Sequence, residues 1–213
     1  MIKALLFPAK CILCGKLLKK QETDLCHHCR EHTPGCTKAN FTISFVARWT
    51  ALWYYKENAR ESLLRYKFKH RRHYCAAYGR LLAMHLQQAG FDDFDILTWV
   101  PISFRRRWKR GFDQVAVIAK ACAKELGCSA QPVLKKVRHT SPQSLLNDVA
   151  KRRANILGAY RVRKSAHVAG RTILLLDDII TTGATASECA KTLQVAGAEK
   201  ILCAAVAVAE YSK

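Results

Sequence analysis

The 213 residues suffice for one good-sized domain and a small additional module, and a hydrophobic content of 50% excludes wholesale disorder. The 36 Lys and Arg against 16 Asp and Glu give a formal net charge of +20. Such an excess is typical of proteins that bind polyanions, so nucleic acid, phosphorylated metabolites and an anionic membrane surface remain as partner classes. A basic but merely soluble protein is the alternative.

No apolar run approaches the roughly 18 residues of a membrane-spanning helix, and the longest, residues 201–209, is half that length. We therefore predict no membrane span. At the start of the chain, Pro8 and Lys10 interrupt a partly apolar stretch before the core of a signal peptide could form. We expect a cytoplasmic protein, in which cysteines are normally reduced.

The first 36 residues hold five of the ten cysteines. Cys11 and Cys14 form one CxxC pair, and Cys26 and Cys29 form another after eleven intervening residues. Each pair places two thiolates on a tight turn, and two such turns complete a tetrahedral, structural zinc site. The alternative, a redox CxxC, requires only one pair. Residues in this segment that could substitute as ligands are Cys36, His27, His28 and His32.

Beyond the cysteine segment, apolar strand-like and helix-like stretches alternate, which favours an α/β domain with a mainly parallel sheet. In chain order we predict strand 50–56, helices 57–68 and 74–88, strand 95–102, helix 114–126 ending at Gly127, strand 172–176, helix 184–195 and strand 200–208. We expect the scattered cysteines to be mostly small core residues: Cys75, Cys122, Cys128, Cys189 and Cys203.

One strand-loop-helix stretch carries two adjacent carboxylates, Asp177 and Asp178, directly after four aliphatic residues. Two neighbouring charges there are costly unless something uses them. In open α/β sheets, ligands bind beyond the carboxyl ends of strands, and the N-terminus of a following helix favours phosphate. The predicted phosphate loop consists of Thr181, Thr182, Gly183, Ala184 and Thr185.

The composition of this loop limits the classes of ligand that it can bind. It contains no lysine, so it is not a Walker-type motif, and no GxGxxG occurs in the chain. A carboxylate only accepts hydrogen bonds, so Asp177 and Asp178 are expected to bind hydroxyls or a metal ion. A ribose 5-phosphate suits both features, because its hydroxyls match the two aspartates and its phosphate matches the loop. If the ligand also carried pyrophosphate, Mg²⁺ would offset the crowded negative charge.

The stretch LLLDDIITTGAT resembles the motif with which type I phosphoribosyltransferases bind phosphoribosyl pyrophosphate (PRPP). Three further stretches resemble sequences of the competence protein ComF/GntX family: VPIS at 100–103, RGFDQ at 110–114 and a block over 138–160. A cysteine head before such a domain is also similar to the architecture of that family. Two departures are Asp113, where the family usually has Asn, and the short cysteine head. The resemblance implies a type I phosphoribosyltransferase-like α/β domain with flanking helices over 41–213, behind a zinc-ribbon-like module over 1–40.

The resemblance also implies roles for two basic segments. Residues 103–110 fall at the superfamily's pyrophosphate loop, where arginines suit bidentate phosphate contacts, although a solvated basic loop is the alternative. Residues 138–153 fall where these enzymes carry a mobile loop over the substrate. The pyrophosphate candidates are Ser103, Arg105, Arg106, Arg107 and Arg110. The lid candidates are Arg138, Gln143, Arg152 and Asn155, of which Gln143 and Asn155 could equally be helix caps.

A third basic cluster, residues 67–74, interleaves cations with aromatic rings. Single-stranded nucleic acid is bound in this way, because bases stack on rings while phosphates meet Lys and Arg. The candidates for DNA binding are Lys67, Lys69, Arg71 and Arg72.

Two functional hypotheses follow. The first is an Mg²⁺-dependent phosphoribosyltransferase that transfers the phosphoribosyl group of PRPP to an acceptor, as in nucleotide salvage. The second, which the family resemblance implies and which we favour, is a PRPP-binding competence protein required for natural transformation. It would handle incoming single-stranded DNA in the cytoplasm and contact the DNA-uptake machinery. The net charge is compatible with DNA binding, because neutralised phosphates release counterions. No residue set identifies an acceptor, so the sequence leaves catalysis open.

Overall fold

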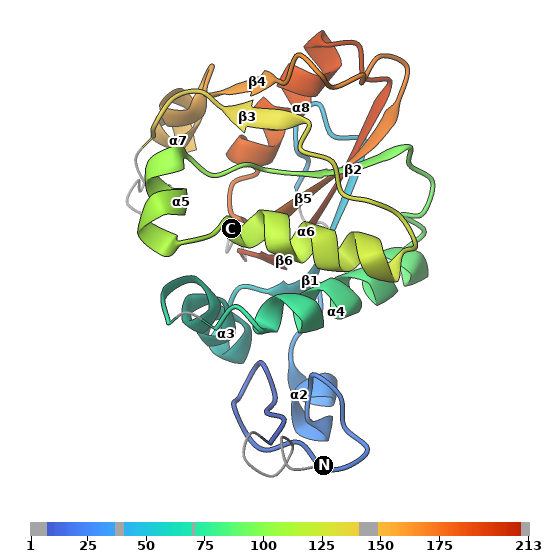
Figure 1. Cartoon of the computed structure of the whole chain (residues 1–213), viewed down its shortest axis with the longest axis vertical. Coiled ribbons are helices and arrows are strands. Elements are labelled where there is room, and N and C mark those ends of the chain that lie inside the picture. Colours follow the sequence, from blue (N-terminus) through green and yellow to red (C-terminus); the bar gives the residue numbers. More distant parts are fainter. Residues whose placement is uncertain (1–7, 37–40, 70, 141–148, 210–213) are drawn as a thin grey trace.

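The structure, a computed structural model, describes residues 8–36, 41–69, 71–140 and 149–209, without the side chain of residue 149. Its centre is a four-stranded sheet in the order β1-β6-β5-β2 (Figure 1). All three neighbouring pairs are parallel. The strands are β1 (Arg48–Tyr54), β2 (Ile96–Trp99), β5 (Thr172–Ile180) and β6 (Lys200–Val208).

Helices cover both faces of this sheet, as parallel sheets require. One face carries α3 (Glu57–Phe68), α4 (Tyr74–Gln88) and α6 (Gln114–Glu125), and the opposite face carries α8 (Ala184–Val195). The predicted α/β fold with a parallel sheet and flanking helices is therefore confirmed. In the described ranges, no helix is long and apolar enough to cross a membrane.

The side chains of β5 alternate between the two apolar cores. Leu174 and Leu176 belong to the core beneath α3, α4 and α6, whereas Ile173 and Leu175 belong to the core beneath α8. All four are fully buried. This burial fixes the register of β5 and thereby the position of its polar carboxyl end.

Smaller elements surround the carboxyl ends of the strands. They are α5 (Phe104–Arg110), the antiparallel pair β3 (Leu134–Lys136) and β4 (Tyr160–Val162), and α7 (Val149–Ile156). Figure 1 shows β3 and β4 above the sheet, with α5 and α7 at its left side.

The cysteine head, residues 8–36, contains α2 (His27–His32) and lies at the bottom of Figure 1, below α3 and α4. Its apolar residues join the same core as those two helices. An ion pair of 2.6 Å between Arg80 of α4 and Asp24 adds a polar contact. The predicted domain boundary after residue 40 adjoins residues outside the described ranges and stays a prediction.

The predicted bounds of α3, α4, α8 and β6 agree with the structure, and β1 lies two residues earlier than predicted. Strand β5 continues from the predicted end at Leu176 to Ile180, so both aspartates lie within it. The sequence did not predict α5, β3 or β4. The α5 sequence FRRRWKR lacks an apolar stripe, and three-residue strands are too short to show a period.

The expectation for the scattered cysteines is met at three positions. Cys122, Cys189 and Cys203 are buried, and Cys75 is half-buried. Cys128 is exposed, contrary to the expectation. It directly follows Gly127, whose positive φ of 70° turns the chain at the end of α6, so this thiol lies on the surface and not in the core.

Candidate functional site at the carboxyl ends of the strands

The two adjacent aspartates form the polar end of β5. Asp177 and Asp178 retain only 8% and 7% exposure. Asp177 still pairs with Ala205 of β6, and its Oδ1 accepts a hydrogen bond of 2.8 Å from the backbone N–H of Asp178. Both carboxylates are therefore held by the sheet itself, on a rigid element.

Asp178 has two further partners, which come from the helices above the sheet. The Nζ of Lys67, in the last turn of α3, lies 2.9 Å from its Oδ2. The Nε2 of Gln114, the first residue of α6, donates to the same oxygen at 3.1 Å. Tyr66 donates to the backbone carbonyl of Gln114 at 2.8 Å, which fixes the start of α6. The Oε1 of Gln114 is buried and has no hydrogen-bond partner among the described residues.

These surroundings give the two carboxyls opposite properties. Burial raises the pKa of Asp177 well above its usual range, and the neighbouring charge of Asp178 raises it further. Burial alone would also raise the pKa of Asp178, but the Lys67 ammonium and the Gln114 amide lower it below the ordinary value. The two pKa shifts thus run in opposite directions: Asp177 holds its proton more tightly than an ordinary carboxyl, whereas Asp178 loses its proton more readily.

The predicted phosphate loop lies directly after β5. Gly183 is the N-cap of α8 and has a φ of 70°, a conformation that strains any residue with a Cβ. A Cβ at this position would also lie 2.9 Å from Cγ1 of Ile43. Thr181, Thr182 and Thr185 are half-buried around the glycine, whereas Ala184 is buried. The loop thus presents hydroxyls and the N-terminus of a twelve-residue helix.

The predicted pyrophosphate loop is the helix α5 in the structure. Arg106 and Arg110, one turn apart, are half-buried, whereas Arg105 and Arg107 are exposed. Arg106 donates to the carbonyl of Thr140 at 3.1 Å. Burial, with the nearby charge of Arg110, lowers the pKa of Arg106.

Ser103 and Lys136 complete the polar surroundings of the Arg106 side chain. The buried Ser103 hydroxyl lies 3.1 Å from Nδ1 of His139. Lys136, of β3, donates to Oγ1 of Thr140 at 2.8 Å and lies 5.0 Å from the ring centroid of Tyr160. Burial and the charge of Arg106 lower the pKa of Lys136 to about 8. Sequence reasoning missed Lys136, since two adjacent lysines in a short stretch give no signal that one of them faces a site.

The lid candidates lie around α7. Arg138 donates to the backbone carbonyls of Asn155 and Leu157, at 3.0 and 2.8 Å, and so ties β3 to the end of α7. Arg152 is half-buried on α7. Gln143 lies outside the described residues.

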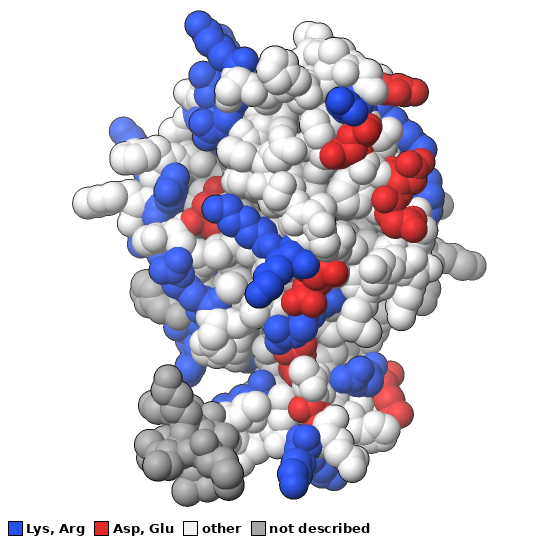
Figure 2. All heavy atoms as spheres, turned by 45° about the vertical axis from the view of Figure 1, so that its right-hand side comes forward, with Lys and Arg blue, Asp and Glu red and all other residues white. Residues whose placement is uncertain are grey.

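The predicted DNA-binding cluster divides into inward and outward residues. Lys67 is directed to Asp178, and its side chain is only 13% exposed. Lys69, Arg71 and Arg72 are exposed, and the guanidinium of Arg72 lies 4.8 Å from the ring centroid of Phe112. On the face drawn in Figure 2, acidic side chains lie between the groups of Lys and Arg, so net charge alone does not locate a polyanion-binding surface.

The four predicted metal ligands converge in the cysteine head. The sulfurs of Cys11, Cys14, Cys26 and Cys29 all lie within 4.8 Å of one another, and those of Cys14 and Cys26 are 3.6 Å apart. Sulfurs bound at about 2.3 Å to one tetrahedral zinc lie about 3.8 Å apart, so the cluster fits zinc. Burial would raise the pKa of the Cys11 thiol, but backbone N–H groups, including those of Cys14 and Cys26, bring it to about 7.

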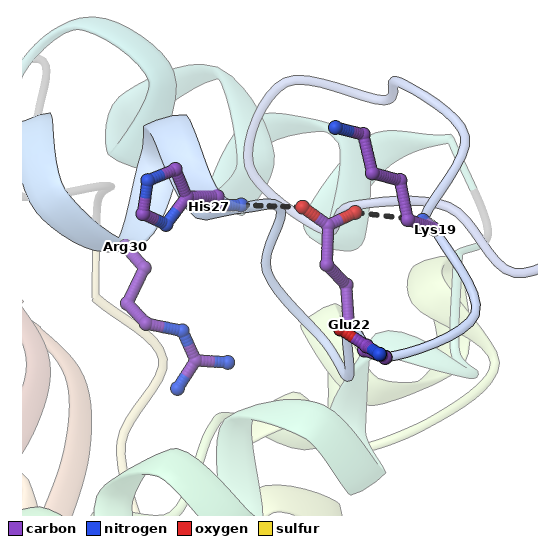
Figure 3. A pocket seen from close by; sticks show the side chains of 5 residues that line it. Lys19, Glu22, His27 and Arg30 are labelled. Atoms are coloured by element: carbon purple, nitrogen blue, oxygen red, sulfur yellow. Dashed lines mark hydrogen bonds between the residues drawn. The ribbon is translucent and has the colours of Figure 1, made fainter.

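A shallow pocket lies beside this cluster (Figure 3). The Glu22 carboxylate accepts hydrogen bonds of 2.7 Å from the backbone N–H groups of Lys19 and His27. The second of these bonds caps the start of α2. Because the Glu22 carboxylate already accepts two backbone hydrogen bonds, we interpret the pocket as part of the scaffold of the head. Its lining consists of Lys19, Gln21, Glu22, His27 and Arg30.

Comparison with known proteins places this architecture in a family. Residues 115–212 match the Phosphoribosyl transferase domain family. Competence protein F of Haemophilus influenzae is 25% identical over 218 residues, which cover 92% of this chain and 95% of that protein. Competence protein ComFC of Streptococcus pneumoniae is 26% identical over 225 residues, 90% of this chain and 96% of that protein. These relatives and the matched domain support membership of the chain in the ComF family.

A further relative of this chain is the DNA utilization protein YhgH of Salmonella typhimurium. It is 33% identical over 140 residues, which cover 63% of this chain and 60% of the relative's own length. The matched domain over 115–212 contains the aspartate pair and the phosphate loop, whereas the cysteine head lies before it.

Proposed function

We propose that this ComF-family chain binds PRPP at the carboxyl end of β5 and handles incoming single-stranded DNA in the cytoplasm during its uptake. The observation that carries the ligand assignment is the buried carboxyl pair directly before a glycine-containing helix N-terminus. The carboxyl pair suits sugar hydroxyls, and the helix N-terminus suits a phosphate.

The ribose assignment follows from the hydrogen-bonding capacity of the pair. Asp178, whose lowered pKa favours the ionised form, accepts from a ribose hydroxyl, and Asp177, whose raised pKa favours the protonated form, can donate to one. The unpartnered Oε1 of Gln114, beside Asp178, supplies one more acceptor for a hydroxyl. One donor and two acceptors thus suit the two adjacent hydroxyls of a ribose better than they suit a second phosphate.

The pyrophosphate assignment rests on buried and half-buried cations from three elements. Arg106 and Arg110 are half-buried on α5, and Lys136 of β3 is close enough to Arg106 for the charge of Arg106 to lower its pKa. Lys67 is close enough to exchange its contact with Asp178 for a contact with a bound anion. Bound Mg²⁺ would neutralise part of the pyrophosphate charge, and carboxylates with substrate phosphates are the ligands it prefers.

The zinc assignment is structural. Four cysteine ligands leave no open coordination position, so this site would stabilise the head and not bind substrate. The contacts of the head with α3 and α4 extend that stabilisation to the helices above the sheet.

The DNA assignment is supported by charge and by relatives. The net charge of +20 favours a polyanion, and exposed Lys69, Arg71 and Arg72 provide phosphate contacts. Relatives carry the names competence protein F and DNA utilization protein. Binding of a single-stranded oligonucleotide should weaken steeply as salt rises, because counterions are released. Binding without salt dependence contradicts this part of the proposal.

Calorimetry tests the PRPP assignment. In the presence of Mg²⁺, PRPP should bind more tightly than either ribose 5-phosphate or pyrophosphate, since only PRPP engages all three groups of residues. Equal affinity for PRPP and pyrophosphate contradicts the ribose assignment. Release of pyrophosphate from PRPP, measured against a panel of acceptors that includes single-stranded DNA, distinguishes a transferase from a PRPP-responsive binding protein.

A further inference from the structure

We propose that the outward face of α5 is a surface on which unpaired bases of single-stranded nucleic acid stack. This inference rests on the DNA part of the proposed function and assigns it to particular residues. Phe104 and Trp108 are 79% and 82% exposed. They are four residues apart, so both rings lie on one side of the helix.

The same helix presents cations around the two rings. Arg105, Arg107 and Lys109 are all exposed. None of the seven residues of α5 is buried, so packing against the core does not explain its large aromatic side chains. Aromatic rings that alternate with cations bind single strands without sequence preference, because every base has a ring face and every nucleotide a phosphate.

The residues on the inner side of α5 have a different role. Arg106 and Arg110 are half-buried, and Arg106 is bonded to Thr140 beside the proposed pyrophosphate position. Gly111, with a φ of 76°, ends the helix and directs the chain away. Two arginines one turn apart thus anchor the helix, which leaves the opposite side with Phe104 and Trp108 free for a partner.

Phe68 and Arg72 extend the proposed surface at the carboxyl end of α5. The guanidinium of Arg110 lies 5.2 Å from the ring centroid of Phe68, which is 61% exposed. Arg72 lies over Phe112, immediately after α5. Phe68 and Arg72 therefore lie beside the carboxyl end of α5 and add an exposed ring and an exposed cation at that end of the helix.

Charge and shape favour nucleic acid over a lipid surface. A helix that lies in a membrane interface buries a broad apolar face, whereas α5 has two aromatic residues among five cations over seven residues. Isolated rings with cations on both sides match the alternation of bases and phosphates in a single strand.

The test is binding of a fluorescently labelled oligothymidylate of about 20 nucleotides to the full chain, followed by anisotropy. We expect Phe104→Ala/Trp108→Ala to weaken binding about tenfold or more, because base stacking on each ring is lost. Trp108→Phe, which keeps a ring, should retain most of the affinity. Met84→Ala removes an exposed apolar side chain from α4 and should leave binding unchanged.

Variants that remove charge test how the cations of α5 contribute to nucleic-acid binding. Arg105→Gln/Arg107→Gln should lower the slope of log affinity against log salt by about 1.4, since each phosphate contact to a single strand contributes about 0.7. Lys120→Gln/Lys124→Gln removes the same charge from the exposed side of α6 and should change the slope less. PRPP affinity of Phe104→Ala/Trp108→Ala should equal that of the wild type, which shows that the strand-end site is intact.

Three outcomes would overturn the inference. If Phe104→Ala/Trp108→Ala binds the oligonucleotide like the wild type, α5 is not the stacking surface, although the proposed DNA function stands. If the wild type does not bind the oligonucleotide, the DNA function fails and this inference with it. If the variant loses affinity only for vesicles of anionic lipid, α5 is a membrane-binding surface.

Discussion

The cysteine head and the strand-end site both gather charged groups, but they neutralise the charge differently. In the head, four cysteine sulfurs lie within 4.8 Å of one another, so a single metal ion would bind all of them as thiolates. At the strand ends, Lys67 neutralises Asp178, while burial raises the pKa of Asp177 and so favours its uncharged form. The head is thus a closed structural unit, whereas the strand-end site keeps polar groups that a ligand can engage.

The largest effect is expected in the head. Cys11→Ser/Cys26→Ser removes two of four ligands, and structural zinc contributes about 10–16 kcal/mol of apparent binding free energy in zinc-finger peptides. Zinc content should fall to near zero, and thermal unfolding should begin at a much lower temperature. Cys128→Ser, at an exposed thiol outside the cluster, is the matched control. Full zinc content in the double variant would end the four-cysteine assignment.

Breaking the ion pair at the strand ends should have the next largest effect on stability. Lys67→Met leaves the buried Asp178 carboxylate without its cation, which costs about 3 kcal/mol in the free energy of unfolding at neutral pH. Because the folded-state pKa of Asp178 is lowered, this contribution is present above the unfolded value and disappears as pH falls through the folded value. Lys69→Met, at an exposed neighbour, should change stability little.

Urea unfolding at several pH values measures this dependence. A difference between the wild type and Lys67→Met that stays constant as the pH falls would show that the ion pair with Asp178 is not its source.

A smaller effect of opposite sign is expected at Asp177. Its folded-state pKa is raised, so its cost to stability grows as pH rises from the unfolded value of about 3.9 through the folded value. Asp177→Asn should therefore stabilise the chain by about 1 kcal/mol at neutral pH, with less gain at acidic pH. Asp92→Asn, at an exposed carboxylate, serves as the control. A destabilised Asp177→Asn chain would contradict the protonation of Asp177.

The smallest effect concerns Lys136, whose pKa is lowered to about 8. Loss of its proton removes a positive charge, so PRPP affinity should fall a few-fold as pH rises from 7 to 9, a change of less than about 1.4 kcal/mol. Lys136→Met should bind more weakly at pH 7 and show a flatter profile. Lys135→Met, at the exposed neighbour, should keep the wild-type profile. A pH profile shared by all three chains would place Lys136 outside the ligand site.

The two regions also differ in how well their residues could be predicted. The four ligands of the head lie within one short segment, so the CxxC spacing sufficed to predict their convergence. At the strand ends, the motif predicted Asp177, Asp178 and the loop, but Gln114 reaches Asp178 from 64 positions away. Such a contact depends on how α6 crosses the sheet, which local patterns do not contain.

Lys67 and α5 show the same limit of local reasoning. The sequence placed Lys67 in an exposed basic cluster, because its neighbours are cations, yet the last turn of α3 directs it into the core. The run of three arginines predicted one phosphate-binding loop. As a helix, it places Arg106 on the inner side and Arg105 and Arg107 on the outer side. The helical period determines which arginines lie on each side, and it can be applied only once the segment is known to be helical.

The most direct test of the central claim is calorimetry of PRPP with Mg²⁺ against Asp177→Asn/Asp178→Asn. The substitution keeps the shape of both side chains, and the matched control is Asp92→Asn/Asp93→Asn, an adjacent but exposed pair. A hydrogen bond to a charged group contributes about 1.5–3 kcal/mol, so loss of the Asp178 charge should lower affinity about tenfold or more in the first variant and not in the control. Unchanged affinity in Asp177→Asn/Asp178→Asn would contradict PRPP binding at this site.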